Sequence, residues 1–505
     1  DYVFTTTFPP DSTVGKAVTK LLELLRLLRV ASRNMDDPEL LATVKAKVTL
    51  IEKHKMGGDC LNTGCVPSKA LIKSARLAWH DKEADKYGFD AIRSEFRFSK
   101  LMARVHKVIE KIEAHDSVER YTELGVDCRQ GEARIVSPWE VEIRNGDSTE
   151  TLTARSIIIA SGARPFVPPI PGNDSEGCLV YRTLDDLDAI QAAAKNATNG
   201  VVVGGGLLGL EAANALRGLN LDTAVVEFAP RLMPRQVDSE GGELLKEKIE
   251  ALGVQVLTER ATQRIEPGDN SRLRMVFQDD KVLETDLIVF SAGIRPQDTL
   301  ARECGLSIGE RGGVVIDDQC RTSDPNILAI GEVALWNQSI FGLVAPGYQM
   351  AKTAVATLTG GDICFSGADM STKLKLLGVD VGSIGDAHGN QNPGARMFRY
   401  LDPLTQVYRK LVVTSDGKKL LGAMLVGDNS AYDTLLQYYA NGIELPKEPA
   451  SLILPQQSGA APALGPDALP ETAMICSCHN VSKGDICGVI DAGCTDLAGV
   501  KAETK

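Results

Sequence analysis

The sequence of 505 residues predicts an α/β fold followed by a small α+β domain. Short apolar runs such as Val48–Glu52, Ser156–Ala160 and Ile327–Ile330 are typical of buried strands. A further apolar strand, Val201–Val203, runs directly into a glycine-rich turn and then a helix. After about residue 361 the pattern changes to alternating strands such as Lys410–Val413, which indicates a domain of a different kind.

Changes in composition and pattern divide the chain into segments. We expect one long charged helix over Phe98–Leu124 and a rigid connection at the proline-rich stretch Pro165–Gly172. The predicted segments are 1–44, which is atypical; 45–171 and 296–360, the two parts of one Rossmann-like domain; 172–295, a second Rossmann-like domain; 361–454, the α+β domain; 455–470, a linker rich in Pro, Ala and Gly; and 471–505, a small separate piece.

Composition excludes several classes of function. The net charge of −12 argues against non-specific nucleic-acid binding, because no basic excess exists to neutralise phosphates. No apolar run reaches the roughly 18 residues needed to cross a bilayer, so we expect no membrane association. The 11 cysteines are sparse and unevenly placed, unlike a secreted disulfide framework. We therefore expect a cytoplasmic protein.

The glycine-rich turn has the features of a dinucleotide-binding site. Gly204 permits the tight turn, Gly206 lets backbone N–H groups approach a pyrophosphate, and Gly209 lets the helix sit close to the strand. The next strand ends on Glu227, at the spacing where an acid hydrogen-bonds a ribose 2′-hydroxyl. A carboxylate there repels a 2′-phosphate, so we expect NADH rather than NADPH, although Arg231 nearby favours the phosphate.

A nicotinamide site implies an acceptor for the hydride, and three segments resemble those that hold FAD. They are Val48–Glu52, Ile157–Pro165 and Thr322–Glu332. By this resemblance 45–171 and 296–360 form an FAD-binding domain and 172–295 an NAD(H)-binding domain. The residues assigned to FAD are Glu52, Gly57, Gly58, Ser161, Gly162, Gly293, Gly331 and Glu332.

The first part of the expected FAD domain departs from this pattern. Its glycine fingerprint is expected near residue 29, yet no glycine lies between Gly15 and Gly57. Side chains at those positions would block close approach to a pyrophosphate. Two alternatives stay open: the FAD pyrophosphate is held differently, or this end of the chain is altered and flavin binding is impaired.

Two cysteines form the sharpest local motif. The stretch Gly57–Lys69 resembles the redox-active disulfide of the pyridine nucleotide-disulfide oxidoreductases, such as mercuric reductase and dihydrolipoamide dehydrogenase. The resemblance implies that Cys65 lies against the flavin ring, that Cys60 exchanges with substrate and that Lys69 points toward the flavin. The helix start at which the family places this motif lowers a thiol pKa. None of the six histidines has the context of the acid–base residue that this family uses for thiol exchange.

Residues from about 172 to 505 resemble a different relative, the large subunit of NAD(P)H-dependent nitrite reductase. The matching stretches are Cys178–Thr183, Val201–Glu227, Pro230–Met233, Gly342–Gly347, Ser371–His388 and Ile475–Lys505. The preceding stretch, about residues 45–171, is instead similar to mercuric-reductase-like proteins. We therefore interpret the chain as composite, with its join near Pro165–Gly172, and the resemblance implies a place in nitrate assimilation.

The last segment resembles the first half of a [2Fe–2S] site. Cys476 and Cys478 match it, whereas that family completes the site with a Cys-x-x-Cys pair some thirty residues further on, which this sequence does not contain. Two thiolates do not hold a cluster that needs four protein ligands, and Cys487 and Cys494 have a different spacing. The cluster is thus an open alternative with an incomplete ligand set. The sirohaem domain is also missing, so we do not expect this chain alone to reduce nitrite.

Three interpretations follow from these patterns. In the first, the chain is an NADH-dependent FAD oxidoreductase that resembles the NADH-dehydrogenase portion of the nitrite reductase large subunit and passes electrons to an iron–sulfur acceptor. In the second, it is a disulfide or metal-ion reductase that uses Cys60 and Cys65. In the third, it is a composite or truncated chain that binds no flavin. We favour the first, with NADH as substrate, an unassigned redox acceptor and a homodimer as one assembly open to it.

Overall fold

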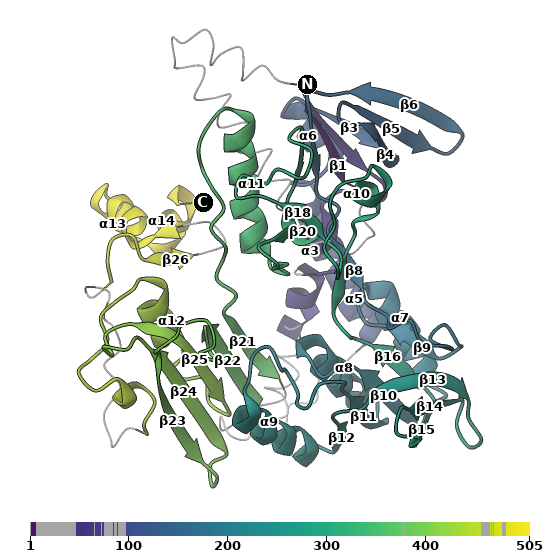
Figure 1. Cartoon of the computed structure of the whole chain (residues 1–505), viewed down its shortest axis with the longest axis vertical. Coiled ribbons are helices and arrows are strands. Elements are labelled where there is room, and N and C mark those ends of the chain that lie inside the picture. The colour runs from purple at the N-terminus through teal and green to yellow at the C-terminus, as the bar shows by residue number, and fades with distance from the viewer. Residues whose placement is uncertain are drawn as a thin grey trace. The chain divides into compact units, whose positions relative to one another are not determined.

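The computed structural model describes residues 2–6, 47–64, 66–71, 73–74, 84, 88, 97–376, 379–455, 465, 467, 469–476 and 481–504 (Figure 1). The chain divides into two compact units. Unit 1 comprises residues 1–165, 182–187 and 294–368, and unit 2 comprises 166–181, 188–293 and 369–505. In the described part of the chain, no helix is both long enough and apolar enough to cross a membrane.

A five-stranded parallel sheet forms the centre of unit 1. Its strand order is β19-β7-β1-β2-β3. The strands are β1 (Tyr2–Thr6), β2 (Val48–Glu52), β3 (Val126–Gln130), β7 (Ser156–Ile159) and β19 (Ile327–Ala329). The predicted strands at 48–52, 156–160 and 327–330 are confirmed to within one residue, and their apolar side chains are buried because helices and loops cover both faces.

Strand β1 was not predicted, since residues 1–44 gave no clear pattern. Its backbone pairs with β2 on one side and β7 on the other, from Tyr2 opposite Val48 to Thr6 opposite Glu52. It therefore takes the central position from which a Rossmann-like domain extends its phosphate-binding turn. The turn itself and the fingerprint position near residue 29 lie outside the described residues.

The remaining elements of unit 1 surround this sheet. An antiparallel sheet comprises β4 (Glu132–Ser137), β5 (Glu140–Asn145) and β6 (Ser148–Thr153), and strand pairs join β8 (Ala163–Pro165) to β17 (Ile294–Pro296) and β18 (Val314–Ile316) to β20 (Ala334–Trp336). The helices are α3 (Gly58–Asn62), α5 (Phe98–Glu113), α6 (Val118–Glu123), α10 (Thr299–Glu303), α11 (Val344–Leu358) and the 3-10 turn η3 (Gly331–Val333); α7 (Leu184–Ala194) has residues in both units.

The prediction of one helix over Phe98–Leu124 is wrong, because two helices occupy this stretch. Helix α5 ends at Glu113, and α6 begins after Ser117, whose side chain accepts a hydrogen bond from Arg120 N. Serine favours this capping position over a helix interior, so Ser117 starts a second helix after α5 has ended at Glu113.

Unit 2 contains a second parallel sheet, with the order β12-β11-β10-β16-β9. Its strands are β9 (Cys178–Val180), β10 (Asn199–Val203), β11 (Asp222–Val226), β12 (Val254–Leu257) and β16 (Ile288–Phe290). Helices α8 (Leu207–Gly218) and α9 (Ser239–Ala251) belong to this sheet, and β13 (Thr262–Pro267), β14 (Leu273–Phe277) and β15 (Val282–Thr285) form an antiparallel sheet beside it.

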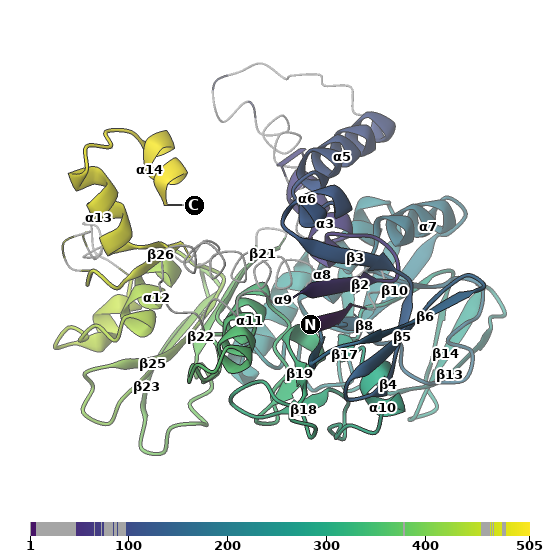
Figure 2. The same cartoon turned by 90° about the horizontal axis from the view of Figure 1, so that it is seen from above.

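The C-terminal part of unit 2 is an antiparallel sheet of order β21-β22-β25-β24-β23 (Figures 1 and 2). Its strands are β21 (Thr372–Leu376), β22 (Val379–Gly385), β23 (Arg396–Asp402), β24 (Val407–Val413) and β25 (Leu420–Val426), followed by α12 (Tyr432–Ala440) and the 3-10 turn η4 (Pro449–Leu452). The chain then forms β26 (Met474–Cys476), β27 (Val481–Ser482), α13 (Lys483–Asp491) and α14 (Leu497–Glu503).

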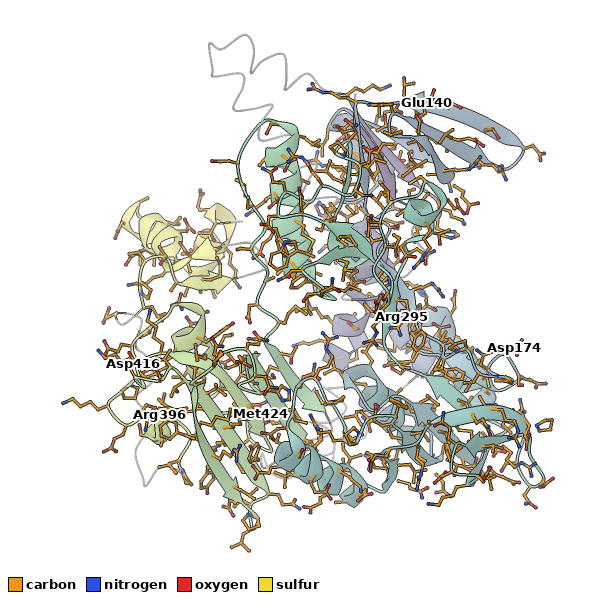
Figure 3. The ribbon with its side chains drawn as sticks, viewed as in Figure 1. Glu140, Asp174, Arg295, Arg396, Asp416 and Met424 are labelled. Atoms are coloured by element: carbon orange, nitrogen blue, oxygen red, sulfur yellow. The ribbon has the colours of Figure 1, made fainter. Side chains whose placement is uncertain are left out.

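The two faces of the C-terminal sheet have different coverings. Tyr408 and Met424 share a core with Leu245 of α9, whereas Leu411 and Leu425, which point to the other face, share a core with α12. One hydrophobic core therefore joins the second parallel sheet, through α9, to the C-terminal sheet. Figure 3 shows Met424 within this sheet.

Candidate dinucleotide-binding sites

The glycine turn of unit 2 is tightly packed at Gly204 and Gly209 and open at Gly206. Gly204 has a φ of +121°, and a Cβ atom there would lie 2.3 Å from Ser291 O. A Cβ atom on Gly209 would lie 1.8 Å from Gly204 O, so α8 lies too close to the turn after β10 for any side chain at this position. At Gly206, by contrast, no atom lies within 4 Å of the Cβ position. The turn therefore leaves open space beside the first residues of α8, where no side chain caps the helix.

Glu227 lies directly beside this turn. Its Oε2 atom accepts a hydrogen bond of 2.6 Å from Gly205 N, and its Oε1 atom accepts one of 2.7 Å from Ala229 N. Arg231, which favoured a 2′-phosphate in the sequence, instead donates through Nε to Val237 O at 2.9 Å. The carboxylate is thus the charged group fixed against the glycine turn.

Glu211 in α8 was missed by the sequence reasoning. Burial raises the pKa of its carboxyl group above the ordinary value. Burial also raises the pKa of the neighbouring Tyr181 to about 12, and the charge of Glu211 adds to this rise. An acid two residues after Gly209, among the buried residues Leu210 and Ala212, was a signal that the pattern contained.

The FAD-assigned residues of unit 1 follow the carboxyl ends of three parallel strands. Since these ends meet at one edge of a sheet, Glu52 at the end of β2, Ser161 after β7 and Glu332 after β19 belong to the same edge. Glu52 and Glu332 are buried, with 6% and 3% of their surfaces exposed. Two buried carboxylates at one edge fit the hydroxyl-bearing parts of FAD, because a carboxylate accepts hydrogen bonds from hydroxyl groups.

Hydrogen bonds within the chain hold this edge. Glu52 Oε1 accepts from His54 N at 2.8 Å, and the buried Ser161 donates from Oγ to Gln297 O at 2.6 Å. Gln297 N donates in turn to Gly162 O at 2.8 Å. Ser161 thus joins the turn after β7 to the segment after β17. Gly162 and Gly331 both have positive φ angles, of 69° and 77°.

Gly293, the remaining glycine assigned to FAD, belongs to unit 2 rather than to the FAD-domain unit. Its φ is 97°, its Cβ position is open, and its carbonyl accepts a hydrogen bond from Phe166 N at 2.9 Å. Gly293 therefore joins the stretch after β16 to the stretch after β8.

The cysteine motif is only partly described. Gly57 and Gly58 have positive φ angles, and α3 carries the backbone of Cys60. The side chain of Cys60 and all of Cys65 lie outside the described residues, so the predicted disulfide stays a prediction. Lys69 is exposed in the helical stretch 66–71.

The predicted iron–sulfur ligands also lie at the limit of the described residues. Cys476 ends β26, and its side chain and Cys478 fall outside the description. Cys487 and Cys494 are free, half-buried thiols. Among the residues that the structure describes, no group of three His, Cys, Asp or Glu side chains is arranged to hold a metal ion.

Comparison with known proteins identifies the family. Residues 39–357, more than half of the chain, match the family described as pyridine nucleotide-disulphide oxidoreductase. The chain belongs to this family. Residues 371–443 match the C-terminal domain of rubredoxin NAD+ reductase. LpdA from Mycobacterium tuberculosis has the same fold, with a TM-score of 0.66 at 18% identity over 87% of this chain and 93% of that one.

The similar proteins include nitrite reductase large subunits and a dihydrolipoyl dehydrogenase. The nitrite reductase [NAD(P)H] large subunit of Klebsiella oxytoca is 56% identical over 76% of this chain, and the nitrite reductase (NADH) large subunit of Escherichia coli K12 is 52% identical over 76%. Dihydrolipoyl dehydrogenase of Geobacillus stearothermophilus is 29% identical over 77% of this chain and 83% of its own length. The chain spans only 40% and 46% of the two nitrite reductase subunits.

Family membership confirms the predicted fold class, which has two dinucleotide-binding domains and a smaller C-terminal domain. Pyridine nucleotide-disulphide oxidoreductases are FAD-dependent NAD(P)H oxidoreductases, so the family implies FAD and NAD(H) as cofactors. The prediction of an NADH- and FAD-dependent oxidoreductase is thereby confirmed at the level of the family.

Proposed function

We propose that this chain is the NADH-oxidising flavoprotein portion of an enzyme similar to the nitrite reductase large subunit. Hydride enters from NADH, and electrons leave one at a time to an iron–sulfur acceptor. The similarity to the two nitrite reductase subunits supports this proposal, and this chain spans 40% and 46% of their length.

The observation that carries the proposal is the Glu227 carboxylate bonded to Gly205 N in the glycine turn. A ribose 2′-hydroxyl that reaches Glu227 gains a charge-assisted hydrogen bond, whereas a 2′-phosphate meets a like charge. The open space at Gly206 and the start of α8 receive the pyrophosphate. We therefore propose NADH as the preferred nucleotide, with Gly204, Gly206, Gly209 and Glu227 as its binding residues.

The FAD side of the proposal rests on unit 1. Bound FAD would supply the acceptor for the hydride and would release electrons singly. Glu52 and Glu332 are proposed to bind hydroxyl groups of the flavin's ribose and ribityl parts, and Ser161 to hold the turn beside them through its bond to Gln297 O. The other residues proposed for this site are Gly57, Gly58, Gly162, Gly293 and Gly331.

Flavin content and NADH oxidation test the proposal directly. We expect the purified protein to contain about one FAD per chain and to reduce ferricyanide with NADH at a rate that a Cys60→Ser variant keeps. A colourless protein that takes up no added FAD would instead support a chain that binds no flavin, and would refute the proposal.

A second candidate is a disulfide or metal-ion reductase that uses Cys60 and Cys65, with Lys69 toward the flavin. The glycine-led start of α3, which carries Cys60, and the similarity to dihydrolipoyl dehydrogenase favour it. Titration with NADH separates the two candidates. A long-wavelength charge-transfer band that a Cys65→Ser variant lacks would support the second candidate, and ferricyanide reduction that is independent of Cys60 supports the first.

Three further features are proposals of the same kind. A [2Fe–2S] cluster bound in part by Cys476 and Cys478 would appear as iron and acid-labile sulfide in the purified protein. A homodimer would appear in sedimentation, and a cytoplasmic location in cell fractionation. Absence of iron would leave NADH oxidation in place, because the cluster lies after the flavin in the proposed electron path.

A further inference from the structure

Residues 231–238, here called the connecting segment, lie between the nucleotide site and helix α9. The segment contacts the glycine turn, because Met233 N donates to Gly205 O at 2.9 Å. The side chain of Leu232 lies 2.6 Å from the Cβ position of Gly205, and both Leu232 and Met233 are fully buried. Gly205 N is the donor to Glu227, so a shift of the connecting segment moves the turn and the proposed ribose ligand together.

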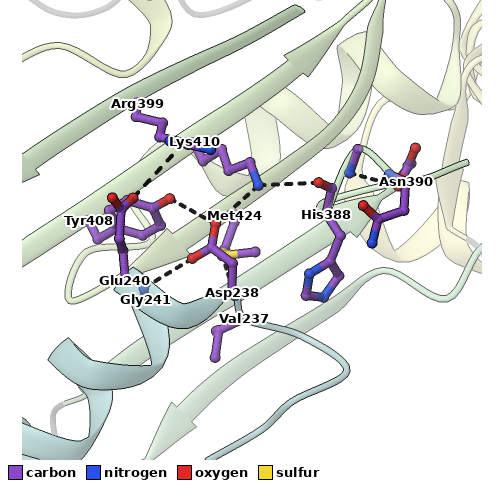
Figure 4. Close-up of polar contacts among 12 residues, drawn as sticks. Val237, Asp238, Glu240, Gly241, His388, Asn390, Arg399, Tyr408, Lys410 and Met424 are labelled. Atoms are coloured by element: carbon purple, nitrogen blue, oxygen red, sulfur yellow. Dashed lines mark hydrogen bonds and ion pairs between the residues drawn. The ribbon is translucent and has the colours of Figure 1, made fainter. Parts of the chain in front are cut away.

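The other end of the segment is held by the C-terminal sheet. Asp238 begins α9, and its Oδ1 atom accepts from Gly241 N at 3.1 Å. Its Oδ2 atom accepts from Lys410 Nζ at 3.0 Å and from the hydroxyl group of Tyr408 at 2.9 Å (Figure 4). Lys410 and Tyr408 belong to β24, and Met424 of β25 adds a contact of 3.3 Å from its sulfur to Asp238 N.

A second contact holds the segment at Arg235. Lys410 Nζ also donates to His388 O at 3.3 Å, and the ring Nε2 of His388 lies 3.1 Å from Arg235 O. His388 follows β22, so two different parts of the C-terminal domain contact the connecting segment. Figure 4 shows Lys410 between Asp238 and His388.

The ion pair between Lys410 and Asp238 is unusual because its lysine is almost fully buried. The Lys410 side chain is 3% exposed and that of Asp238 is 20% exposed. A buried ion pair is often no more stabilising than apolar side chains of similar volume, but it fixes geometry, because each charge tolerates burial only with its partner in place. Burial acts to raise the pKa of Asp238, and the bonds from Gly241, Lys410 and Tyr408 more than offset this effect, so the pKa lies below its ordinary value.

We propose that Lys410 and Asp238 are positioning residues for the nicotinamide nucleotide, through which the C-terminal sheet holds the connecting segment, and hence Gly205 and Glu227, in the geometry that binds NADH. The inference rests on the proposed NADH site and adds to it two contacts from the C-terminal sheet. A change at Lys410 therefore alters the affinity for NADH and not the chemical step.

The test compares Lys410→Met with Arg409→Met in the full chain. Arg409 is the neighbour on β24, its side chain is 13% exposed, and its guanidinium donates to Ile453 O at 2.9 Å and pairs with Asp428. These partners belong to the C-terminal domain, so Arg409→Met perturbs the sheet without removing a contact to the connecting segment. Anaerobic calorimetry on protein reduced beforehand with dithionite gives the Kd for NADH without hydride transfer, and ferricyanide reduction gives KM and kcat.

We expect Lys410→Met to raise the Kd and KM for NADH by about five- to tenfold, the lower range of measured couplings between sites, with kcat within about twofold of the wild type. We expect Arg409→Met to keep the wild-type Kd even where it lowers the Tm. A wild-type Kd in folded Lys410→Met would overturn the inference. Failure of the wild type to bind NADH would overturn the proposed function instead.

Asp238→Asn keeps the inference testable if Lys410→Met does not fold. It keeps the acceptor for Gly241 N and removes the charge that pairs with Lys410. We expect Asp238→Asn to raise the Kd for NADH by about the same factor as Lys410→Met. The Asp238→Asn/Lys410→Met double variant should show no further rise, because both changes break the same contact. Wild-type affinity in Asp238→Asn, or fully additive losses in the double variant, would contradict a shared positioning role.

Discussion

Gly206 offers a substitution that separates nucleotide binding from folding. Its φ is −82°, which suits any residue, and no atom lies within 4 Å of its Cβ position. Gly206→Ala should therefore fold normally and gain about 0.4–1 kcal/mol, because alanine restricts the unfolded chain. The added methyl group occupies the space proposed for the pyrophosphate. Loss of one backbone hydrogen bond to a charged phosphate costs about 1.5–3 kcal/mol. We thus expect the Kd for NADH to rise about 10- to 150-fold.

The assay is anaerobic calorimetric titration of the dithionite-reduced protein with NADH, together with a thermal unfolding curve of each variant. Gly218→Ala is the matched control, since it adds a methyl group in open space at the other end of α8 and should keep the wild-type Kd. Gly209→Ala should instead destabilise the protein, because its Cβ atom would lie 1.8 Å from Gly204 O. A wild-type Kd for NADH in Gly206→Ala would refute the placement of the pyrophosphate.

Other substitutions test the ribose site, the core and a buried turn. Replacing Glu227 by Ala removes a charged acceptor for the ribose, and we expect the Kd for NADH to rise about tenfold while that for NADPH changes less; equal NADH affinity in variant and wild type would refute the ribose assignment. Ile158→Ala in the fully buried centre of β7 should cost about 2–5 kcal/mol in urea unfolding, and a loss below about 1 kcal/mol would contradict the packing of this sheet. Burial acts to raise the pKa of Asp386, but bonds from the side chain of Asn392 and from the backbone N–H groups of Gln391, Asn390 and Gly389 more than offset it, so its pKa is lowered. Its contribution to stability is then present above about pH 4 and is lost as the pH falls through the folded pKa, so the Tm gap between wild type and Asp386→Asn should narrow below about pH 4. A gap that stays constant with pH would count against this.

The sequence predicted those parts of the fold that a short stretch of neighbouring residues determines. The turn from Val203 through Gly209 needs glycine because backbone atoms approach closely there, and the pattern of strand, glycines and helix is read within ten residues. Strand β1 was missed because five residues without a recognisable turn after them carry little signal. The break between α5 and α6 was missed because Ser117 interrupts a stretch that otherwise reads as one charged helix.

The contacts of the C-terminal domain could not be predicted in the same way. Alternation along β24 puts Tyr408 and Lys410 on one face, and a lysine in such a pattern is normally assigned to the solvent side. Its partner Asp238 is 172 residues away, so no local spacing connects the two. Asp238 caps α9, a role that depends only on neighbouring residues, whereas its bonds to β24 depend on the tertiary fold.

The burial of Lys410 also shows why stability alone is a poor guide to its role. Methionine fills a similar volume but leaves the Asp238 carboxylate without its charged partner, so we expect Lys410→Met to lower the Tm even though Asp238 keeps Gly241 N and the Tyr408 hydroxyl as donors. Methionine cannot supply a donor that bonds both Asp238 and His388 O. Through these bonds Lys410 holds the connecting segment directly at Asp238 and, by way of the His388 ring, at Arg235 O. If the pair were retained only for folding, Lys410→Met and Arg409→Met would differ in Tm and agree in NADH affinity. The segment contacts the glycine turn through the hydrogen bond from Met233 N to Gly205 O. We therefore expect the reverse: the two variants should differ mainly in their KM for NADH.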